Sequence, residues 1–327
     1  MNRTMLEMKD LRIHYVVGGE VTEAVNGVSL SLSPGETLGL VGETGAGKTT
    51  LAKGIMGIVP DPPGRIVAGE IFFEGEDLLK KTPREMRRIR GNKISMIFQD
   101  PMTALNPVIP VGDQIAEVVR LHQKLSRAQA AQKAQEMLEL VGIPGIRYGE
   151  YPHQFSGGMK QRVIIAIALA CSPALLIADE PTTALDVTIQ AQILDLMNKL
   201  KKDRNTSMLL ITHDFGVVAE TCDKVAILYA GEIIESGTVE DIFRDPTHPY
   251  TIGLFESLPD VDSTSTRLNP IAGLMPDPAA LPVGCSFAPR CRHCTEACTR
   301  AAVPLTALSP THTIRCVRFG ARKEAEK

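Results

Sequence analysis

The feature that most constrains the fold of this chain is the octapeptide at residues 42–49. It matches the phosphate-loop pattern G-x-x-x-x-G-K-[ST] at each fixed position. An apolar run, Thr37–Val41, precedes it, and residues of helical composition follow it as far as Met56. Glycines allow backbone N–H groups to turn inward around an anion, and the dipole of the following helix attracts the same anion. The alternative is an ordinary glycine-rich turn with a lysine there by chance.

The match in this context favours a nucleotide site. Lys48 is expected to reach the β- and γ-phosphates of the nucleotide, and the Thr49 hydroxyl is expected to bind Mg²⁺. The residues predicted to contact nucleotide in this segment are Gly42, Glu43, Thr44, Gly45, Ala46, Gly47, Lys48, Thr49 and Thr50.

Composition argues against several classes of protein. Acidic and basic residues nearly cancel over the 327 residues, leaving a formal charge of −3, so there is no electrostatic argument for nucleic-acid binding. The N-terminus lacks the apolar core of a signal peptide. The most apolar stretch, residues 163–178, is interrupted by Ser172-Pro173 and is shorter than a bilayer span, which predicts a core helix and then a buried strand. We therefore expect a cytosolic chain that reaches a membrane only through a partner.

Two adjacent acids follow a buried strand. The apolar run Ala174–Ala178 ends at Asp179 and Glu180. Buried parallel strands are apolar throughout, and ligands bind at their carboxyl ends. Because side chains alternate along a strand, the two carboxylates should point in opposite directions. Asp179 is then expected to hold Mg²⁺ through water and Glu180 to act as the general base, whereas the alternative is two solvated acids in a loop.

Three more polar or aromatic residues lie in or directly after predicted strands, and each has two interpretations. Gln99 follows the strand Ile94–Phe98 and either has a catalytic role, as an Mg²⁺ ligand or by orienting water, or is an ordinary polar residue at a strand end. His213 follows the strand that begins at Met208 and either contacts the γ-phosphate or is structural. Tyr15 either stacks on adenine or packs on an edge strand.

A second anion site is predicted at Ser156, Gly157 and Gly158, directly before a long apolar helix. Serine caps a helix, and the two glycines leave its first N–H groups exposed. The alternative is a simple helix cap. Earlier in the chain, Gly112–Val141 has helical composition and indicates a helical insertion on the nucleotide core.

In this order, the motifs resemble those of the ATP-binding subunits of ABC transporters, from about Met5 to Phe319. The resemblance implies an α/β fold, with a P-loop core of RecA-like parallel sheet, an antiparallel β subdomain, an inserted helical subdomain and a small cysteine-rich C-terminal extension. The implied boundaries are 1–255 for the ATPase domain, about 102–165 for the helical insertion and 256–327 for the extension. The matching motifs are Walker A at residues 42–49, the Q-loop at Gln99, the signature at Ser156, Gly157 and Gly158, Walker B at residues 175–180, the D-loop at Ala184, Leu185 and Asp186, the switch histidine at His213 and the A-loop at Tyr15.

A narrower resemblance points to the dipeptide/oligopeptide (and nickel) importer branch. Residues 98–107, 248–251 and 284–291 carry it. Phe155 with Met159 is typical of one of two paralogous ATPases in these importers, which implies a heterodimer. The implied partners are the paralogous ATPase, two membrane permease subunits and, through them, an extracytoplasmic solute-binding protein, so the chain is expected to be peripheral at the cytoplasmic face of the membrane. The substrate stays open among peptides, glutathione and nickel chelates.

The resemblance also implies a mechanism in which each subunit supplies half of a site. The phosphate loop, Asp179 and Glu180 of one subunit close over ATP and Mg²⁺ against the Ser156-Gly157 helix end of another. Two other functions are considered. One is a soluble ABC ATPase acting on nucleic acid or ribosomes, which usually has two fused cassettes or long coiled coils. The other is a regulatory subunit without hydrolysis, against which Glu180 and His213 argue.

Five of the seven cysteines lie in the C-terminal region, in the spacing C-x5-C-x2-C-x3-C-x17-C. Thiolates on a loop-rich segment suit zinc or an iron–sulfur cluster, and the spacing alone favours zinc. The family resemblance instead implies a 4Fe–4S cluster, with Cys294 as an extra thiol. Cys171 and Cys222 lie elsewhere in the chain and are expected to be small buried residues. The implied cluster ligands are Cys285, Cys291, Cys298 and Cys316.

Overall fold

The computed structural model describes residues 4–100, 104–182, 186–258 and 270–320. The chain divides into two compact units and passes between them more than once. The helical unit comprises residues 1–7, 31–37 and 72–212, and the phosphate-loop unit comprises residues 8–30, 38–71 and 213–327. Each unit is described by itself, and the predicted domain boundaries stay predictions.

The helical unit contains a parallel sheet in the order β6-β7-β8. Its strands are β6 (Ile94–Ile97), β7 (Leu175–Asp179) and β8 (Ser207–Ile211), and every residue in them is buried. These are the apolar runs from which the sequence predicted buried strands. Because the strands are parallel, their carboxyl ends lie at one edge of the sheet.

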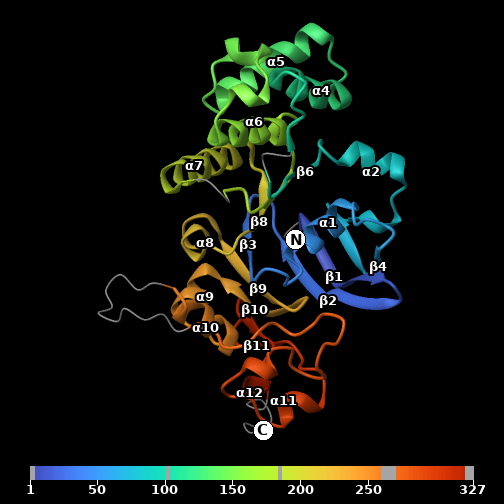
Figure 1. Ribbon diagram of the computed structural model, residues 1–327, viewed down its shortest axis with the longest axis vertical. Helices are drawn as coiled ribbons and strands as arrows, with labels where there is room; N and C mark the ends of the chain where they lie inside the picture. The colour runs from blue at the N-terminus through green and yellow to red at the C-terminus, as the bar shows by residue number, and fades with distance from the viewer. Residues whose placement is uncertain (1–3, 101–103, 183–185, 259–269, 321–327) are drawn as a thin grey trace. The chain divides into compact units, whose positions relative to one another are not determined.

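Several helices belong to this unit (Figure 1). The segment Gly112–Val141 forms two helices, as its composition predicted, and the second begins where Ser126 and Gln129 form a capping box. The helices α4, α5 and α6 contact one another, and α6 also contacts α7. The long elements are α2 (Pro83–Ile89), α4 (Val111–Gln123), α5 (Arg127–Leu140), α6 (Gly157–Leu169) and α7 (Val187–Arg204); the short ones are β5 (Glu76–Asp77), η1 (Leu78–Lys80), η2 (Gly145–Gly149) and η3 (Pro152–Gln154).

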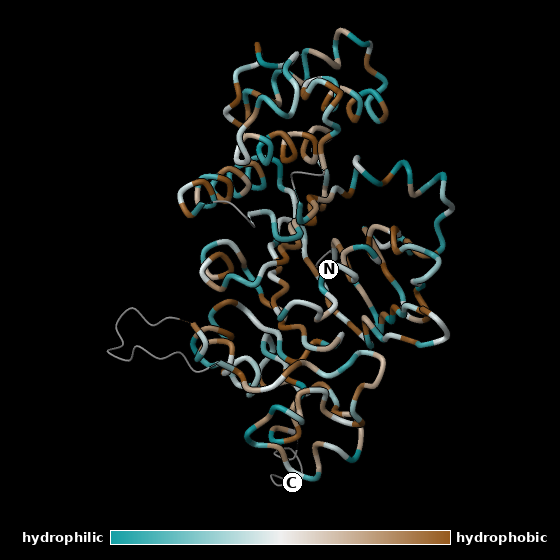
Figure 2. Tube along the Cα trace, viewed as in Figure 1, coloured by the Kyte–Doolittle hydropathy of each residue, from teal (hydrophilic) through white to brown (hydrophobic). Residues whose placement is uncertain are grey.

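The apolar stretch at residues 163–178 divides as predicted into the helix α6 and the strand β7. Figure 2 shows the apolar residues along α6. Buried Cys171 lies in the connection between the two elements, as expected of a small core residue. None of the helices in the described part of the chain is long and apolar enough to cross a bilayer.

The phosphate-loop unit contains most of β1, β2 and β4, which pair in the order β2-β1-β4, and a second set of strands in the order β11-β12-β10-β9-β3. The hairpin between β9 and β10 turns at Ala230 and Gly231, and both have positive φ, as a type I′ turn requires. The strands are β1 (Leu6–Val17), β2 (Glu20–Leu32), β3 (Thr37–Val41), β4 (Gly64–Phe73), β9 (Lys224–Tyr229), β10 (Glu232–Thr238), β11 (Thr306–Ala307) and β12 (Thr313–Ile314). The helices are α1 (Lys48–Met56), α8 (Phe215–Thr221), α9 (Val239–Arg244), α10 (Pro249–Glu256), η4 (Ala288–Arg290), α11 (Ala297–Arg300) and α12 (Val317–Gly320).

Residues 270–320, called here the C-terminal segment, share the hydrophobic core of this unit. Phe287 is buried, and its ring centroid lies 5.3 Å from that of Tyr229 and 5.4 Å from that of Tyr250. Partly buried Cys222 packs against the same core, so its predicted burial is only partly right. The C-terminal segment is therefore part of this fold and not an appended tail.

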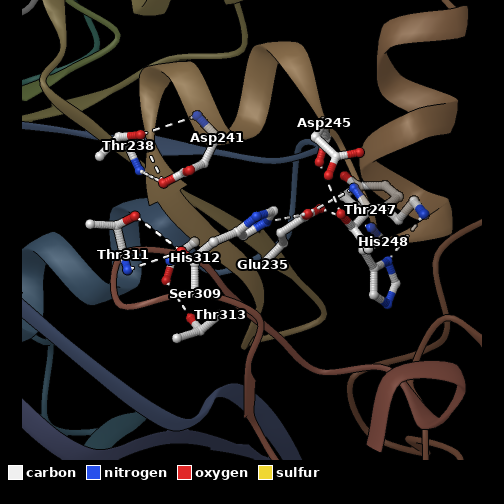
Figure 3. Close-up of polar contacts among 12 residues, drawn as sticks. Glu235, Thr238, Asp241, Asp245, Thr247, His248, Ser309, Thr311, His312 and Thr313 are labelled. Atoms are coloured by element: carbon white, nitrogen blue, oxygen red, sulfur yellow. Dashed lines mark hydrogen bonds and ion pairs between the residues drawn. The ribbon is translucent and has the colours of Figure 1, made fainter. Parts of the chain in front are cut away.

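A buried ion pair fixes the C-terminal segment to β10 (Figure 3). Glu235 is fully buried and accepts hydrogen bonds from the amides of Thr247 (2.8 Å) and His248 (3.0 Å) and from Nε2 of His312 (2.8 Å). Burial alone would raise the pKa of Glu235, but these hydrogen bonds, that of His312 above all, hold it below its ordinary value. Glu235 is therefore ionised, and it tethers a segment 77 residues away in sequence.

Candidate functional site

The phosphate loop lies between β3 and α1, as predicted. Lys48 is the first residue of α1 and is 7% exposed. Its ammonium Nζ donates to the carbonyl oxygens of Gly42 (2.7 Å) and Glu43 (2.9 Å), which curls the loop around the lysine. Thr49 and Thr50 are half-buried in the first turn of the same helix. The loop therefore places a cation and a helix N-terminus together, as anion binding requires.

Two glycines of the loop have no room for a side chain. A Cβ at Gly42 would lie 2.1 Å from the carbonyl oxygen of Leu228, and one at Gly47 would lie 2.3 Å from that of Ala24. Gly47 also has a φ of 104°, which favours glycine. Ala46, between Gly45 and Gly47, is buried.

Two more predicted residues lie in the phosphate-loop unit. Tyr15 is half-buried on β1, and its ring packs against Gly64, where a Cβ would lie 2.6 Å from the Tyr15 ring atom Cε1. His213 is exposed and precedes α8, which Asp214 caps by accepting from the amides of Gly216 (2.8 Å) and Val217 (3.2 Å). The contacts of Tyr15 fit the packing interpretation, and its role with adenine and that of His213 with phosphate stay predictions.

The helical unit brings two predicted catalytic residues together at the edge of its sheet. Asp179 is the last residue of β7 and is 1% exposed, and the next residue, Glu180, has a φ of 47°. The Glu180 amide donates to the Ile211 carbonyl on β8 (2.8 Å), and its carboxylate accepts from Nε2 of Gln99 (3.0 Å). Gln99 and Glu180 are 81 residues apart in sequence. Their hydrogen bond orients a carboxylate at the edge where parallel sheets bind ligands.

The Ser156 motif forms the N-terminus of α6. The Ser156 hydroxyl accepts from the amide of Met159 (3.4 Å), which confirms the cap. Gly157 is exposed and Gly158 is half-buried, and both line an open hollow together with Asp186 and Ile189. The first helical N–H groups therefore lie beside an accessible hollow in the same unit, as the anion-site interpretation requires.

The predicted D-loop is described only in part. Ala184 and Leu185 lie outside the described residues. Asp186 caps α7, and its Oδ1 accepts from the amide of Ile189 at 2.9 Å. Ile189 lies in the first turn of α7 and close to the Ser156 motif, since a Cβ at Gly158 would lie 2.7 Å from the Ile189 side chain.

Four cysteines of the C-terminal segment line one pocket. All seven cysteines of the chain are among the described residues, and all are free thiols. Cys294 is exposed and does not line that pocket. The four that share it are Cys285, Cys291, Cys298 and Cys316, the set that the family resemblance implied.

The pocket imposes different acidities on these thiols. Burial raises the pKa of Cys285 to about 11 and also raises that of Cys316. Burial acts the same way on Cys298, but hydrogen bonds from Thr295 outweigh it and lower the pKa. A metal would have to displace protons from the two raised thiols when it binds.

The residues do not form a site for a single metal ion. Over the described residues, no group of three or more His, Cys, Asp or Glu side chains converges as the ligands of one ion do. The prediction of zinc therefore lacks the expected geometry, and the prediction of a 4Fe–4S cluster has no support from this test either.

Comparison with known proteins identifies the class to which the fold and site belong. Residues 25–183 match the family described as ABC transporter, and residues 234–298 match the family described as oligopeptide/dipeptide transporter, C-terminal region. The chain is 51% identical to the oligopeptide transport ATP-binding protein OppD of Bacillus subtilis, with 95% of this chain and 88% of that protein aligned. It is 49% identical to the dipeptide transport ATP-binding protein DppD of the same organism, with 95% and 94% aligned.

Solved structures agree with this assignment. The dimeric ATP-binding cassette MJ0796 in a post-hydrolysis state with ADP and phosphate has a TM-score of 0.65 and 26% identity, over 72% of this chain and 99% of that one. The chain therefore belongs to the ABC transporter family, in its oligopeptide/dipeptide branch, and is an ABC ATPase that uses ATP and Mg²⁺.

One contact was missed by the sequence analysis. Arg290 lies within residues 284–291, which resemble the importer branch, but no role was predicted for it. Its guanidinium forms an ion pair with Glu43 in the phosphate loop. Only its place in the branch-specific segment could have drawn attention to it, because 247 residues separate the two partners.

Proposed function

We propose that this chain is the ATP-hydrolysing motor subunit of an importer for di- and oligopeptides, peripheral at the cytoplasmic face of the membrane. Relatives of about 50% identity that are named for oligopeptide and dipeptide transport support the substrate class. One observation carries the hydrolytic role: the Glu180 carboxylate is held by Gln99 at the carboxyl edge of the β6-β7-β8 sheet. A base held in this way needs little reorganisation when it activates water.

The proposed site needs two subunits. Phosphoryl transfer depends mainly on positioning and charge stabilisation, so the phosphate loop, Asp179 and Glu180 require additional N–H donors over the γ-phosphate. The open hollow at Gly157 and Gly158 offers such donors to a second protein. We assign that partner as a paralogous ATPase, with two permease subunits and a solute-binding protein completing the transporter.

The catalytic assignment is tested by comparing two variants. Glu180→Gln should retain ATP binding and lose about 10²–10⁴-fold in turnover, because the base is removed and the nucleotide contacts are kept. Lys48→Ala should instead weaken binding itself. Glu117→Gln on the exposed face of α4 is the matched control and should leave both unchanged. Wild-type turnover in Glu180→Gln would remove Glu180 from the role of base.

The substrate is tested in vesicles that contain the permeases and the paralogous ATPase. A binding protein loaded with peptide should stimulate ATP hydrolysis more than one loaded with glutathione or a nickel chelate. Stimulation by a nickel chelate alone would reassign the cargo. Stimulation by nucleic acid without permeases would instead indicate a soluble ABC ATPase.

We also propose that Cys285, Cys291, Cys298 and Cys316 hold a 4Fe–4S cluster. Their lining of one pocket, with Cys294 outside it, supports this ligand set. In such a cluster each thiolate binds a different iron, so the ligands surround a volume and need not converge on one point. A bound cluster would supply a covalent cross-link and one-electron redox chemistry.

Metal analysis of anaerobically purified protein tests this ligand set. We expect a brown protein with iron and sulfide that are lost in Cys291→Ala and kept in Cys294→Ala. Equal loss in both variants would make Cys294 a ligand. A colourless wild-type protein that contains zinc would exclude the cluster.

A further inference from the structure

An arginine of the C-terminal segment contacts the phosphate loop. Arg290 directly precedes Cys291, and its side chain is 6% exposed. Its Nη1 lies 3.1 and 3.0 Å from the two carboxylate oxygens of Glu43, the second residue of the loop. The Glu43 side chain is 29% exposed, so the pair is partly shielded from water and its charges attract each other more strongly than those of a fully exposed pair.

The same guanidinium also donates hydrogen bonds to three other groups. Its Nη1 also contacts the hydroxyl of Tyr229 (3.3 Å), and its Nε and Nη2 donate to the carbonyls of Ala272 (3.1 Å) and Ile271 (3.4 Å). Arginine offers several donors in a rigid plane, so one side chain can join the loop, β9 and the start of the C-terminal segment.

Two more residues of the same unit contact the loop. The Tyr250 hydroxyl accepts from the amide of Glu43 at 3.0 Å, and Tyr250 is fully buried. The methyl carbon Cε of Met275 lies 3.2 Å from the position that a Cβ would take at Gly45. The loop is therefore stabilised by contacts with α10 and the C-terminal segment as well as by β3 and α1.

The negative charge of Glu43 explains why the residue that contacts it is an arginine. A carboxylate within a loop that binds phosphates repels them, and at short range in a partly dry site this repulsion is large. Arg290 compensates the Glu43 charge and fixes the side chain to one side of the loop. We propose that Arg290 is a positioning residue for nucleotide, which makes the ATP affinity of the loop depend on the C-terminal segment. This inference rests on the proposed role of residues 42–49 in binding ATP.

The test is a double-mutant cycle on ATP affinity, measured by titration of the purified chain with ATP and Mg²⁺. Arg290→Ala should raise the Kd for ATP about 3- to 30-fold, the range expected for a residue that acts through another. Glu43→Gln in the Arg290→Ala background should restore much of the affinity, because the uncompensated carboxylate is then gone. Arg290→Lys should lie between wild type and Arg290→Ala, since lysine keeps the charge but not the planar donors.

Arg292→Ala is the matched control. Arg292 is two residues away and forms an ion pair with Glu256, but its side chain is 63% exposed. Its loss should leave the Kd unchanged. In steady-state assays with the paralogous ATPase, Arg290→Ala should raise KM and leave kcat at saturating ATP near the wild-type value.

The outcomes separate this inference from the proposed function. If Lys48→Ala binds ATP like the wild type, the loop assignment itself is wrong. If Lys48→Ala fails to bind and Arg290→Ala binds like the wild type, only the role of Arg290 is overturned. If Arg290→Ala does not fold, Glu43→Gln with Arg290→Met supplies the measurement, and an affinity as poor as that of Arg290→Met alone would exclude charge compensation.

Discussion

The phosphate loop and the C-terminal segment belong to one compact unit but are specified in opposite ways. The contacts of the loop's motif lysine are local: Lys48 donates to carbonyls five and six residues before it. Those that fix the C-terminal segment span 77 residues in the Glu235–His312 pair and 247 in the Glu43–Arg290 pair. A site built from neighbours in sequence can be recognised as a motif, whereas one built from distant partners depends on the complete fold.

The largest expected effects come from two glycines, one in each region. A Cβ at Gly42 would lie 2.1 Å from a backbone carbonyl oxygen, and one at Gly284, whose φ is 89°, would lie 2.2 Å from the carbonyl oxygen of Cys298. Each change to alanine should cost at least about 3 kcal/mol of stability, because backbone atoms must move. Gly149→Ala, with open space around it, is the control.

The two variants are expected to change different properties of the protein, and the comparison of the two regions is wrong if they change the same one. Gly42→Ala should lose ATP binding and keep the iron content, and Gly284→Ala should lose the iron. Titration with ATP and iron analysis measure the two properties. Loss of ATP binding with full iron content in Gly284→Ala would show that the thiol pocket is not the part most sensitive to that glycine.

The next effect is that of the buried tether. Glu235→Ala leaves His312 without its partner in the core and should cost about 3–5 kcal/mol in the free energy of unfolding. The control is Glu240→Ala, which removes an exposed pair with Arg244 and should cost at most about 1 kcal/mol. Urea unfolding followed by circular dichroism gives both values, and equal costs would contradict a structural role for the buried pair.

The same pair predicts a pH dependence. The hydrogen bond with Glu235 raises the pKa of His312 above its ordinary 6.5, and the charges of Asp241 and Asp245 act in the same direction, although burial opposes them. Because the folded-state pKa is the higher one, the stabilisation is complete below about 6.5 and is lost as the pH rises through the folded-state pKa. The destabilisation by His312→Gln should therefore be greater at pH 6 than at pH 9. A difference that grows toward pH 9 would reverse this assignment.

The smallest effect is expected from a local contact in the helical unit. Ser126→Ala removes the cap of α5 and should cost about 1 kcal/mol, with ATP affinity and iron content unchanged. Gln132→Ala, exposed on the same helix, is the control. Thermal melts measure the cost, and a change in ATP affinity would contradict the independence of this cap.

The sequence was sufficient to predict those elements that a local pattern of residues specifies. The strands of the β6-β7-β8 sheet follow from apolar runs, and the cap at Ser156 follows from a serine before a long apolar helix. It also predicted separate strand-end roles for Gln99 and Glu180, but not the hydrogen bond between them.

The other contacts join residues that are far apart in the chain, and no local sequence pattern predicts such pairs. Glu235 is buried next to two buried isoleucines because the register of β10 shifts between Ile233 and Glu235, and alternation along a regular strand would not predict three buried residues in a row. Arg290 sits beside a cysteine ligand candidate, yet its partner is an acid in the phosphate loop. Such pairs become visible only when the fold brings them together.

The most direct test of the account is the mass of the Glu180→Gln variant mixed with the paralogous ATPase, measured by analytical ultracentrifugation. We predict a stable heterodimer with ATP and Mg²⁺ and separate subunits with ADP, because ATP lies between the phosphate loop of one protein and the Ser156 helix end of the other. The same mass in both nucleotides would contradict the two half-sites and, with them, the proposed motor.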